Sequence, residues 1–81
     1  MAKLIPHYAL AEKIGDEVTI DAGSVKELID KGIAAYGEPF REAVASAAIV
    51  VNGRDVAVLR GVKTRLSADD TVWLLLPAGG G

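Results

Sequence analysis

The sequence ends in three consecutive glycines, Gly79, Gly80 and Gly81, and the last of them carries a free carboxylate. Glycine has no side chain to bury and loses much backbone entropy on ordering, so this run adds nothing to a core. Without Cβ atoms, the segment 78–81 can enter a narrow channel, reaching about 13 Å at ~3.3 Å per extended residue. Its α-carboxylate is ionised at neutral pH and can attack the α-phosphate of ATP in a partner enzyme. The glycines alone fit either a frayed chain end or a functional arm.

Elsewhere the chain offers few side chains for catalysis. It has one histidine, His7, which falls in a predicted strand, and no cysteine. Asp69 and Asp70 are adjacent in a predicted turn, where carboxylates usually cap or solvate the turn rather than share a metal. Nucleophilic or metal-assisted catalysis needs several such groups that converge. We therefore expect no metal site, no bound cofactor and no enzymatic activity of the chain by itself.

Composition restricts the class of partner. The 81 residues predict one small globular domain, with 51% hydrophobic and 25% charged residues. Because 9 basic residues stand against 11 acidic ones, for a net charge of −2, the chain has no general attraction to nucleic acid or anionic lipid. The absence of cysteine suits the reducing cytoplasm, and no apolar run approaches the roughly 20 residues of a membrane span. The sequence predicts a soluble cytoplasmic protein.

Strand patterns occupy both ends of the chain. Residues 2–8 and 17–21 predict a hairpin-like pair of strands. Asn52-Gly53 fits a type I′ turn inside a second hairpin over residues 49–59. A last strand is predicted at residues 72–76, directly before the terminal glycines.

Two helices are predicted between these strands. Ser24 followed three residues later by Glu27 is a capping box, which starts a helix that Gly37 ends. Pro39, at a first-turn position, starts a shorter helix that ends near Ser46.

This order predicts an α+β fold, a mixed sheet of about four to five strands packed on one main helix, with the first and last strands as a parallel pair. Side chains in the last strand alternate, so that Val72, Leu74 and Leu76 share one face and Trp73 and Leu75 share the other. Both faces are thus apolar. One belongs to the core, and the other either meets a partner, which we favour, or is covered by the segment 39–47.

Short motifs along nearly the whole chain match one family pattern in the same order. They are His7-Tyr8-Ala9 through Glu12-Lys13-Ile14-Gly15, Ser24-Val25-Lys26-Glu27-Leu28, Val51-Asn52-Gly53, Leu66, Asp69-Asp70-Thr71-Val72 and Leu75-Leu76-Pro77-Ala78-Gly79-Gly80-Gly81. Each motif is weak, but the order and the length together are fairly specific. In them the sequence resembles the ubiquitin-like sulfur carriers (MoaD/ThiS type), and most closely the small subunit of molybdopterin synthase. The resemblance implies a ubiquitin-like β-grasp domain over residues 1–77 and a flexible glycine tail over 78–81.

The resemblance also implies a cycle of sulfur transfer. An adenylating enzyme of the ubiquitin-activating type would activate the Gly81 carboxylate with ATP, and a sulfur donor would convert it to a thiocarboxylate. The tail would then enter the large catalytic subunit of molybdopterin synthase and donate sulfur to a pterin precursor, forming the dithiolene that binds molybdenum or tungsten. Gly81 would carry the sulfur, and Gly80 would permit passage. The candidate docking residues are Trp73, Leu74, Leu75, Pro77, Ala78 and Gly79.

Two departures from the family pattern leave the sulfur acceptor open. Leu76-Pro77 stands where Pro-Pro is usual, and Gly79 replaces a residue that is more often bulky. A triple-glycine end also occurs in thiamin-type carriers, although those chains are shorter. The alternatives are a sulfur carrier for thiamin or cysteine synthesis, a ubiquitin-like modifier that forms isopeptide bonds through Gly81, and an interaction module with an inert tail.

Overall fold

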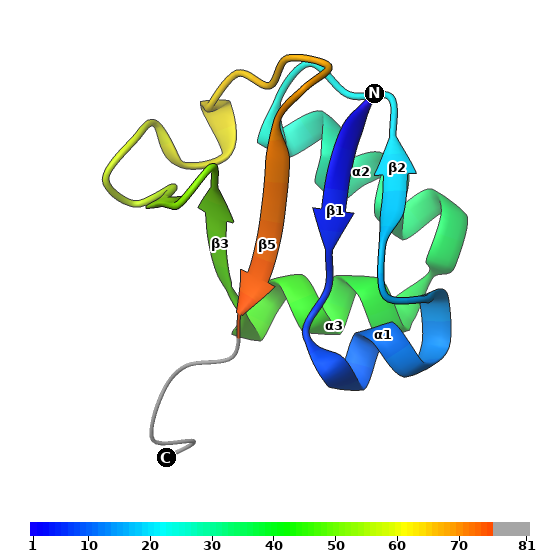
Figure 1. Ribbon diagram of the computed structural model, residues 1–81. Coiled ribbons are helices and arrows are strands. Elements are labelled where there is room, and N and C mark those ends of the chain that lie inside the picture. The colour runs from blue at the N-terminus through cyan, green and yellow to red at the C-terminus, as the bar shows by residue number, and fades with distance from the viewer. Residues whose placement is uncertain (76–81) are drawn as a thin grey trace.

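The structure, a computed structural model, describes residues 1–75 of the chain (Figure 1). Its elements are β1 (Ala2–Ile5), α1 (Tyr8–Ile14), β2 (Val18–Ile20), α2 (Val25–Tyr36), α3 (Glu38–Ser46), β3 (Ala48–Val51), β4 (Arg54–Asp55), the 3-10 turn η1 (Gly61–Lys63) and β5 (Thr71–Leu75). The predicted α+β class is confirmed, with five strands in one mixed sheet. None of the described helices is long and apolar enough to cross a membrane.

The strands lie in the order β2-β1-β5-β3-β4, so the last strand occupies the middle of the sheet (Figure 1). β5 runs parallel to β1, with Leu4 beside Val72, and antiparallel to β3, with Ile49 beside Leu74. The remaining pairs, β1 with β2 and β3 with β4, are antiparallel. The predicted parallel pairing of the first and last strands is therefore confirmed.

The first part of the chain differs from the prediction. β1 and β2 do pair, but a helix, α1, connects them instead of a turn. β1 ends at Ile5 because the next residue, Pro6, has no N–H to donate to a neighbouring strand. Residues 9–13, Ala-Leu-Ala-Glu-Lys, are strong helix formers, and the N–H of Leu10 donates to Nδ1 of His7 at 3.2 Å. His7 is thus the N-cap of α1, not a strand residue.

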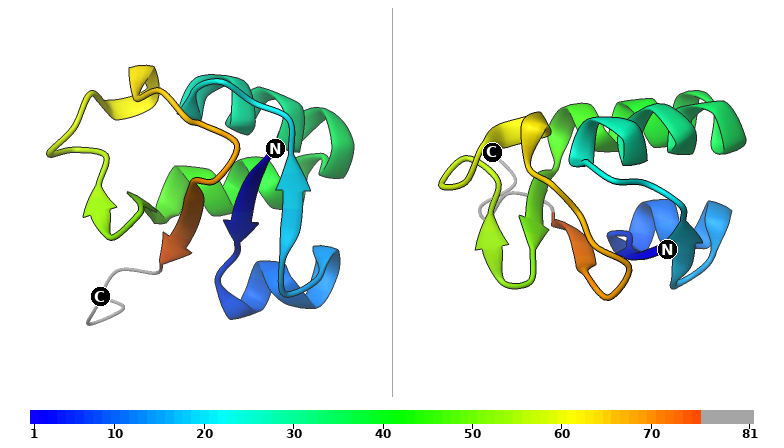
Figure 2. Two further views of the ribbon diagram at one scale, coloured as in Figure 1. Left: turned by 45° about the horizontal axis from the view of Figure 1, so that its top comes forward. Right: turned by 90° about the horizontal axis from the view of Figure 1, so that it is seen from above.

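The other two helices begin and end close to the predicted residues. The N–H of Glu27 donates to Oγ of Ser24 at 3.1 Å, which is the first half of the capping box. The Glu27 carboxylate closes the second half by accepting from the N–H of Gly23 at 2.6 Å. Pro39 lies in the first turn of α3, and that helix ends at Ser46 as predicted. Both helices lie on one face of the sheet, as the view from above in Figure 2 shows.

A close approach between α2 and α3 depends on one glycine. Gly32 is buried in α2, and the fully buried ring of Phe40 in α3 lies directly against it. A Cβ atom placed on Gly32 would overlap that ring. The absence of a side chain at Gly32 therefore sets how closely the two helices pack.

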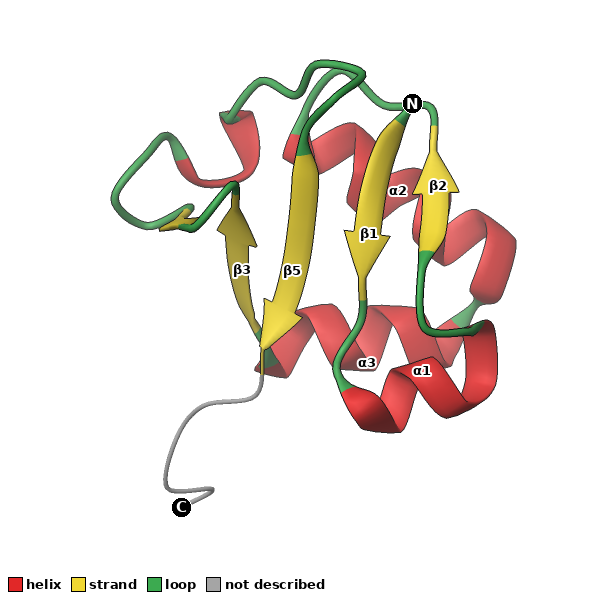
Figure 3. Cartoon of the chain, in the orientation of Figure 1, coloured by secondary structure: helices red, strands yellow, loops and turns green. Residues whose placement is uncertain are grey.

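The predicted hairpin at residues 52–53 is confirmed, but its second strand is short. Asn52 and Gly53 have φ angles of 51° and 86°, as a type I′ turn requires. β4 ends at Asp55, whose carboxylate accepts from the N–H of Ala57 at 2.8 Å and so turns the chain out of the sheet. The strand predicted through Leu59 is wrong beyond Asp55. A loop and η1 follow instead (Figure 3).

The core fills the space between the sheet and the helices. Each of β1, α1, α2, α3 and β5 contributes to it. The large side chains that are fully buried are Leu4, Leu10, Val25, Leu28, Phe40, Val72 and Leu74.

Candidate functional site

β5 is the last described element, and it leads directly to the predicted glycine arm. Its side chains alternate as predicted: Val72 and Leu74 are 0% and 1% exposed, whereas Trp73 and Leu75 are 41% and 45% exposed. The remaining candidates lie outside the described residues, and their roles stay predictions. These candidates are Pro77, Ala78, Gly79, Gly80 and Gly81.

The exposed side chains of β5 belong to a wider apolar surface, which we call the open face. Its members are Ile5, Ala48, Val50, Trp73 and Leu75. The strand register places Trp73 between Ile5 and Val50, and it places Leu75 beside Ala48, so these side chains project from the same side of the sheet. Because α2 and α3 both cover the opposite side, the alternative in which the segment 39–47 covers the open face is wrong (Figure 2).

Leu74 does not belong to the open face. It is 1% exposed and pairs with Ile49, which is 8% exposed, so both side chains lie in the core. A partner cannot contact Leu74 while the domain remains folded. The prediction that Leu74 helps to dock a partner is therefore wrong, and the described docking candidates of β5 are Trp73 and Leu75.

A hydrogen-bonded turn fixes the start of β5. Asp70 accepts from the N–H of Ser67 at 2.8 Å and from the side-chain amide of Asn52 at 2.8 Å. Asn52 in turn accepts from the N–H of Thr71 at 3.0 Å. The bonds from Ser67 and Asn52 stabilise the ionised carboxylate and hold the pKa of Asp70 below its usual value. Asp70 thus caps the turn, as expected.

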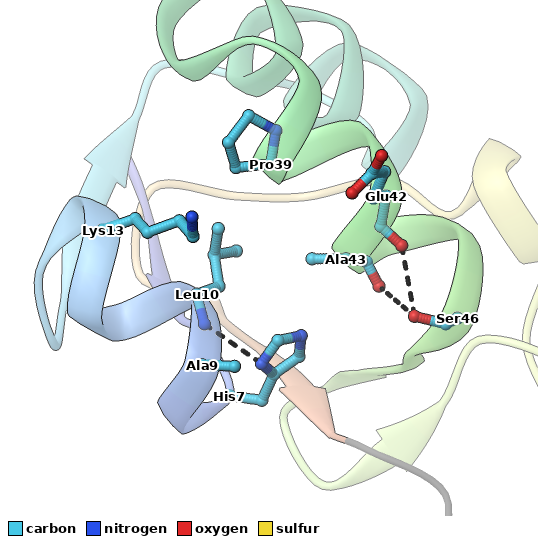
Figure 4. Close-up of a pocket in the computed structure, with 8 residues that line it drawn as sticks. All are labelled: His7, Ala9, Leu10, Lys13, Pro39, Glu42, Ala43 and Ser46. Carbon is cyan, nitrogen blue, oxygen red and sulfur yellow. Dashed lines mark hydrogen bonds between the residues drawn. The ribbon is translucent and has the colours of Figure 1, made fainter.

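A shallow hollow of about 270 Å³ opens between α1 and α3 (Figure 4). Its lining comprises His7, Ala9, Leu10, Lys13, Pro39, Glu42, Ala43 and Ser46. Nε2 of His7 is buried and has no hydrogen-bond partner among residues 1–75, whereas Nδ1 caps α1. The hydroxyl of Ser46 donates to the carbonyl oxygen of Glu42 at 3.1 Å, so it bonds to its own helix rather than to a base. The lining therefore has no activated nucleophile.

Residues 1–75 also contain no group of three or more His, Cys, Asp or Glu side chains that could hold a metal ion. Within that range, the open face is an exposed apolar surface, and the central strand β5 contributes Trp73 and Leu75 to it. Sequence reasoning missed the hollow because it missed α1. The helix-forming run Ala9–Lys13 was the signal that could have revealed both.

Solved structures of other proteins share this architecture over nearly the whole chain. Small archaeal modifier protein 1 from Methanosarcina acetivorans is 23% identical, with a TM-score of 0.82 over 99% of this chain and 95% of that one. The BexX/CysO complex from Amycolatopsis orientalis contains a match of 20% identity, with a TM-score of 0.85 and full coverage of both chains. The chain has the ubiquitin-like β-grasp fold. The fold that the sequence resemblance implied is thus confirmed.

A third β-grasp neighbour is a protein from Pyrococcus furiosus proposed to be subunit 1 of molybdopterin converting factor. It is 24% identical, with a TM-score of 0.72 over 95% of this chain and 97% of that one. The sequence itself matches no family model and no curated protein. At these identities the comparisons establish the β-grasp fold, and the function has to be argued from the chain.

Proposed function

We propose that this β-grasp protein is a cytoplasmic sulfur carrier that acts as the small subunit of molybdopterin synthase. In this proposal the Gly81 carboxylate is adenylated and then converted to a thiocarboxylate that donates sulfur. The observation that carries the proposal is that β5, a strand of the open face, leads in the sequence directly to the glycine tail, residues 78–81. Trp73 and Leu75 are exposed on the strand that ends six residues before Gly81. A partner that binds to these two side chains would lie close enough to bind the glycine tail as well.

The partners supply most of the chemistry. An adenylating enzyme of the ubiquitin-activating type binds ATP, and an oxygen of the Gly81 carboxylate attacks the α-phosphate, releasing pyrophosphate. Sulfur from a donor then displaces AMP from the acyl-adenylate, which leaves the thiocarboxylate. The carrier supplies the reactive end, the glycines that let it enter a channel, and the docking surface. Catalysis of sulfur transfer to the pterin precursor belongs to the large subunit.

Mass spectrometry of the protein purified from its own cells tests the chemistry. We expect a fraction of the C-terminal peptide to show the mass gain that replaces one oxygen by one sulfur. Deleting Gly80 and Gly81 should abolish this species. If the C-terminal peptide never carries sulfur in cells that make molybdopterin, the proposal is wrong.

A matched pair of variants tests the docking surface. Leu75→Glu adds a charge to the open face, whereas Ala35→Glu adds the same charge to an exposed position of α2, on the opposite side of the sheet. Apolar side chains in the centre of an interface carry much of the binding free energy. We therefore expect L75E to weaken binding to the large subunit at least tenfold, and A35E to leave it unchanged, in titration calorimetry with purified subunits. Equal effects would place the interface elsewhere.

A protein modifier is the second candidate, and the similarity to small archaeal modifier protein 1 favours it. In that case the activated Gly81 forms isopeptide bonds with lysines of other proteins. The same mass-spectrometry experiment distinguishes the two, because conjugation leaves residues 66–81 of this chain attached to lysines of target proteins after digestion with trypsin, whose last cleavage site in the chain is Arg65. A carrier for thiamin or cysteine synthesis would instead form the thiocarboxylate but donate its sulfur to a different enzyme. Adding each candidate acceptor enzyme to the purified thiocarboxylate identifies the pathway.

A further inference from the structure

A second surface, distinct from the open face, concentrates positive charge. The exposed residues Arg60, Lys63 and Arg65 lie on η1 and its flanks, and we call them the basic platform. Residues 56–68 contain these three basic residues and no acidic one, which gives a charge of +3. Because the whole chain carries −2, the remaining residues carry −5. This segment is thus basic in a chain that is acidic as a whole, and Asp55 and Asp69 stand directly at its two ends.

Figure 1 shows η1 at the end of the sheet where β5 begins, away from the end where β5 finishes. On the helix side of the sheet, η1 contacts α2. It therefore does not overlap the open face. The three cations have no acidic partner among residues 1–75, as is also true of Lys13 and Arg54, whereas the other four cations each pair with a carboxylate. Lys63 and Arg65 line two shallow hollows, of about 380 and 470 Å³.

Hydrogen bonds hold the platform in one conformation. Thr64, a buried polar residue, accepts from the N–H of Arg60 through Oγ1 at 3.1 Å. Its carbonyl oxygen accepts from the N–H of Val25 in α2 at 2.9 Å. The N–H of Leu66 donates to the carbonyl oxygen of Gly23 at 2.9 Å. A backbone fixed at both ends costs little further entropy on binding, which favours a docking surface over a merely solvated loop.

The N-terminus of α2 beside the platform is not an anion site. Ser24 and the carboxylate of Glu27 already accept from the N–H groups of Glu27 and Gly23. The cationic side chains themselves must therefore provide the attraction.

We propose that the basic platform binds an acidic surface patch of a partner protein. A long polyanion such as DNA, or an anionic membrane, would extend past the platform and meet the acidic remainder of the chain, within a Debye length of about 8–10 Å. A compact acidic patch on a protein covers less of that acidic surface, of which Glu27 lines the same hollow as Lys63 and Arg65. Val58 and Val62, which are 80% and 46% exposed, add apolar contact area beside the cations, a mixture typical of protein interfaces. The platform contains no aromatic residue on which a base could stack.

Titration of the isotope-labelled full chain tests this proposal by NMR. The probe is a synthetic decapeptide of eight glutamates and two leucines, used at low salt, and a DNA duplex and anionic vesicles serve as competing polyanions. We expect shifts confined to residues 58–65 and their neighbours in α2. The triple variant R60Q/K63Q/R65Q should bind about tenfold more weakly, because each exposed ion pair contributes modestly. The matched variant K13Q/K31Q/R41Q removes the same charge from the three helices and should bind as the wild type does.

Four outcomes would overturn the proposal. They are no shifts at low salt, shifts spread over all cationic residues, equal weakening in the two triple variants, and tighter binding of DNA or vesicles than of the peptide. Denaturation of each variant in urea establishes that it is folded, so that a loss of binding reports on the surface. The test does not involve Gly81, so its result is independent of the proposed sulfur chemistry.

Discussion

Two neighbouring leucines in β5 provide a strong test of the structure. Leu74→Ala and Leu75→Ala delete the same three carbons, one residue apart, from the core and from the open face. Leu74 is 1% exposed, whereas Leu75 is 45% exposed. The structure therefore predicts that the same chemical change has very different effects on the free energy of unfolding.

The magnitudes follow from burial. An 81-residue domain has a free energy of unfolding of about 4–12 kcal/mol, at ~0.05–0.15 kcal/mol per residue. Leu74→Ala leaves a cavity and should cost about 3 kcal/mol, within the ~2–5 kcal/mol measured for buried leucines. Leu75→Ala leaves no enclosed cavity and loses only part of its apolar contact area, so it should cost about 1 kcal/mol at ~0.8 kcal/mol per buried methylene. At ~4–8 °C per kcal/mol, the expected decreases in Tm are about 12–24 °C and about 4–8 °C.

Urea denaturation followed by circular dichroism measures both variants. The dependence of the unfolding free energy on urea should have the same slope in each, so that the midpoints can be compared directly. Binding to the large subunit should show the opposite order, with Leu75→Ala the more harmful at a temperature where both are folded. Equal losses of stability would refute the assignment of the two faces of β5, and with it the open face.

Three further predictions concern single positions, each measured by urea denaturation. Gly32→Ala should destabilise the domain by about 1–3 kcal/mol through overlap with Phe40, although alanine favours helix; a gain in stability would show that α2 and α3 can separate. His7→Asn should be about 1 kcal/mol more stable than His7→Ala, because asparagine still caps α1; equal stability would mean that the cap contributes nothing. Asp70→Asn should lose about 1 kcal/mol at neutral pH, a value reduced for solvent screening. Because folding lowers the pKa of Asp70 from its usual 3.8, the wild-type advantage should be complete well above pH 3.8 and disappear as the pH falls through the lower folded value. An advantage that does not change with pH would rule out the charged hydrogen bonds.

Local signals predicted much of this fold. The capping box of Ser24 and Glu27 and the Asn52-Gly53 turn each satisfy backbone geometry within a few residues, so the sequence alone specifies them. The period of two in β5 likewise predicted which side chains share a face, because alternation is fixed by the strand itself. It did not show which face is the core. That depends on where α2 and α3 pack, and this is why Leu74 was placed among the docking residues.

The missed helix has a different cause. His7 is an uncommon N-cap, since serine, threonine, aspartate and asparagine are preferred, so nothing conventional marked the start of α1. The apolar residues 2–8 continued the strand pattern across Pro6, although proline interrupts pairing there. The segment after Asp55 was misread for a related reason, since a side-chain hydrogen bond to the N–H of Ala57 overrides β-propensity. In both places a polar contact marks where an element begins or ends, and hydrophobic periodicity cannot detect that contact.

The central position of β5 has a mechanical consequence for a chain that is held by its end. A pull at the C-terminus acts along β5, which is hydrogen-bonded to β1 on one side and to β3 on the other. β1 runs in the same direction, so the first strand and the last resist such a pull in shear, with many bonds loaded together rather than one after another. A pull across the strands would instead break these bonds one after another. The topology thus allows an enzyme to draw on the terminal residues with force while the domain behind them stays intact.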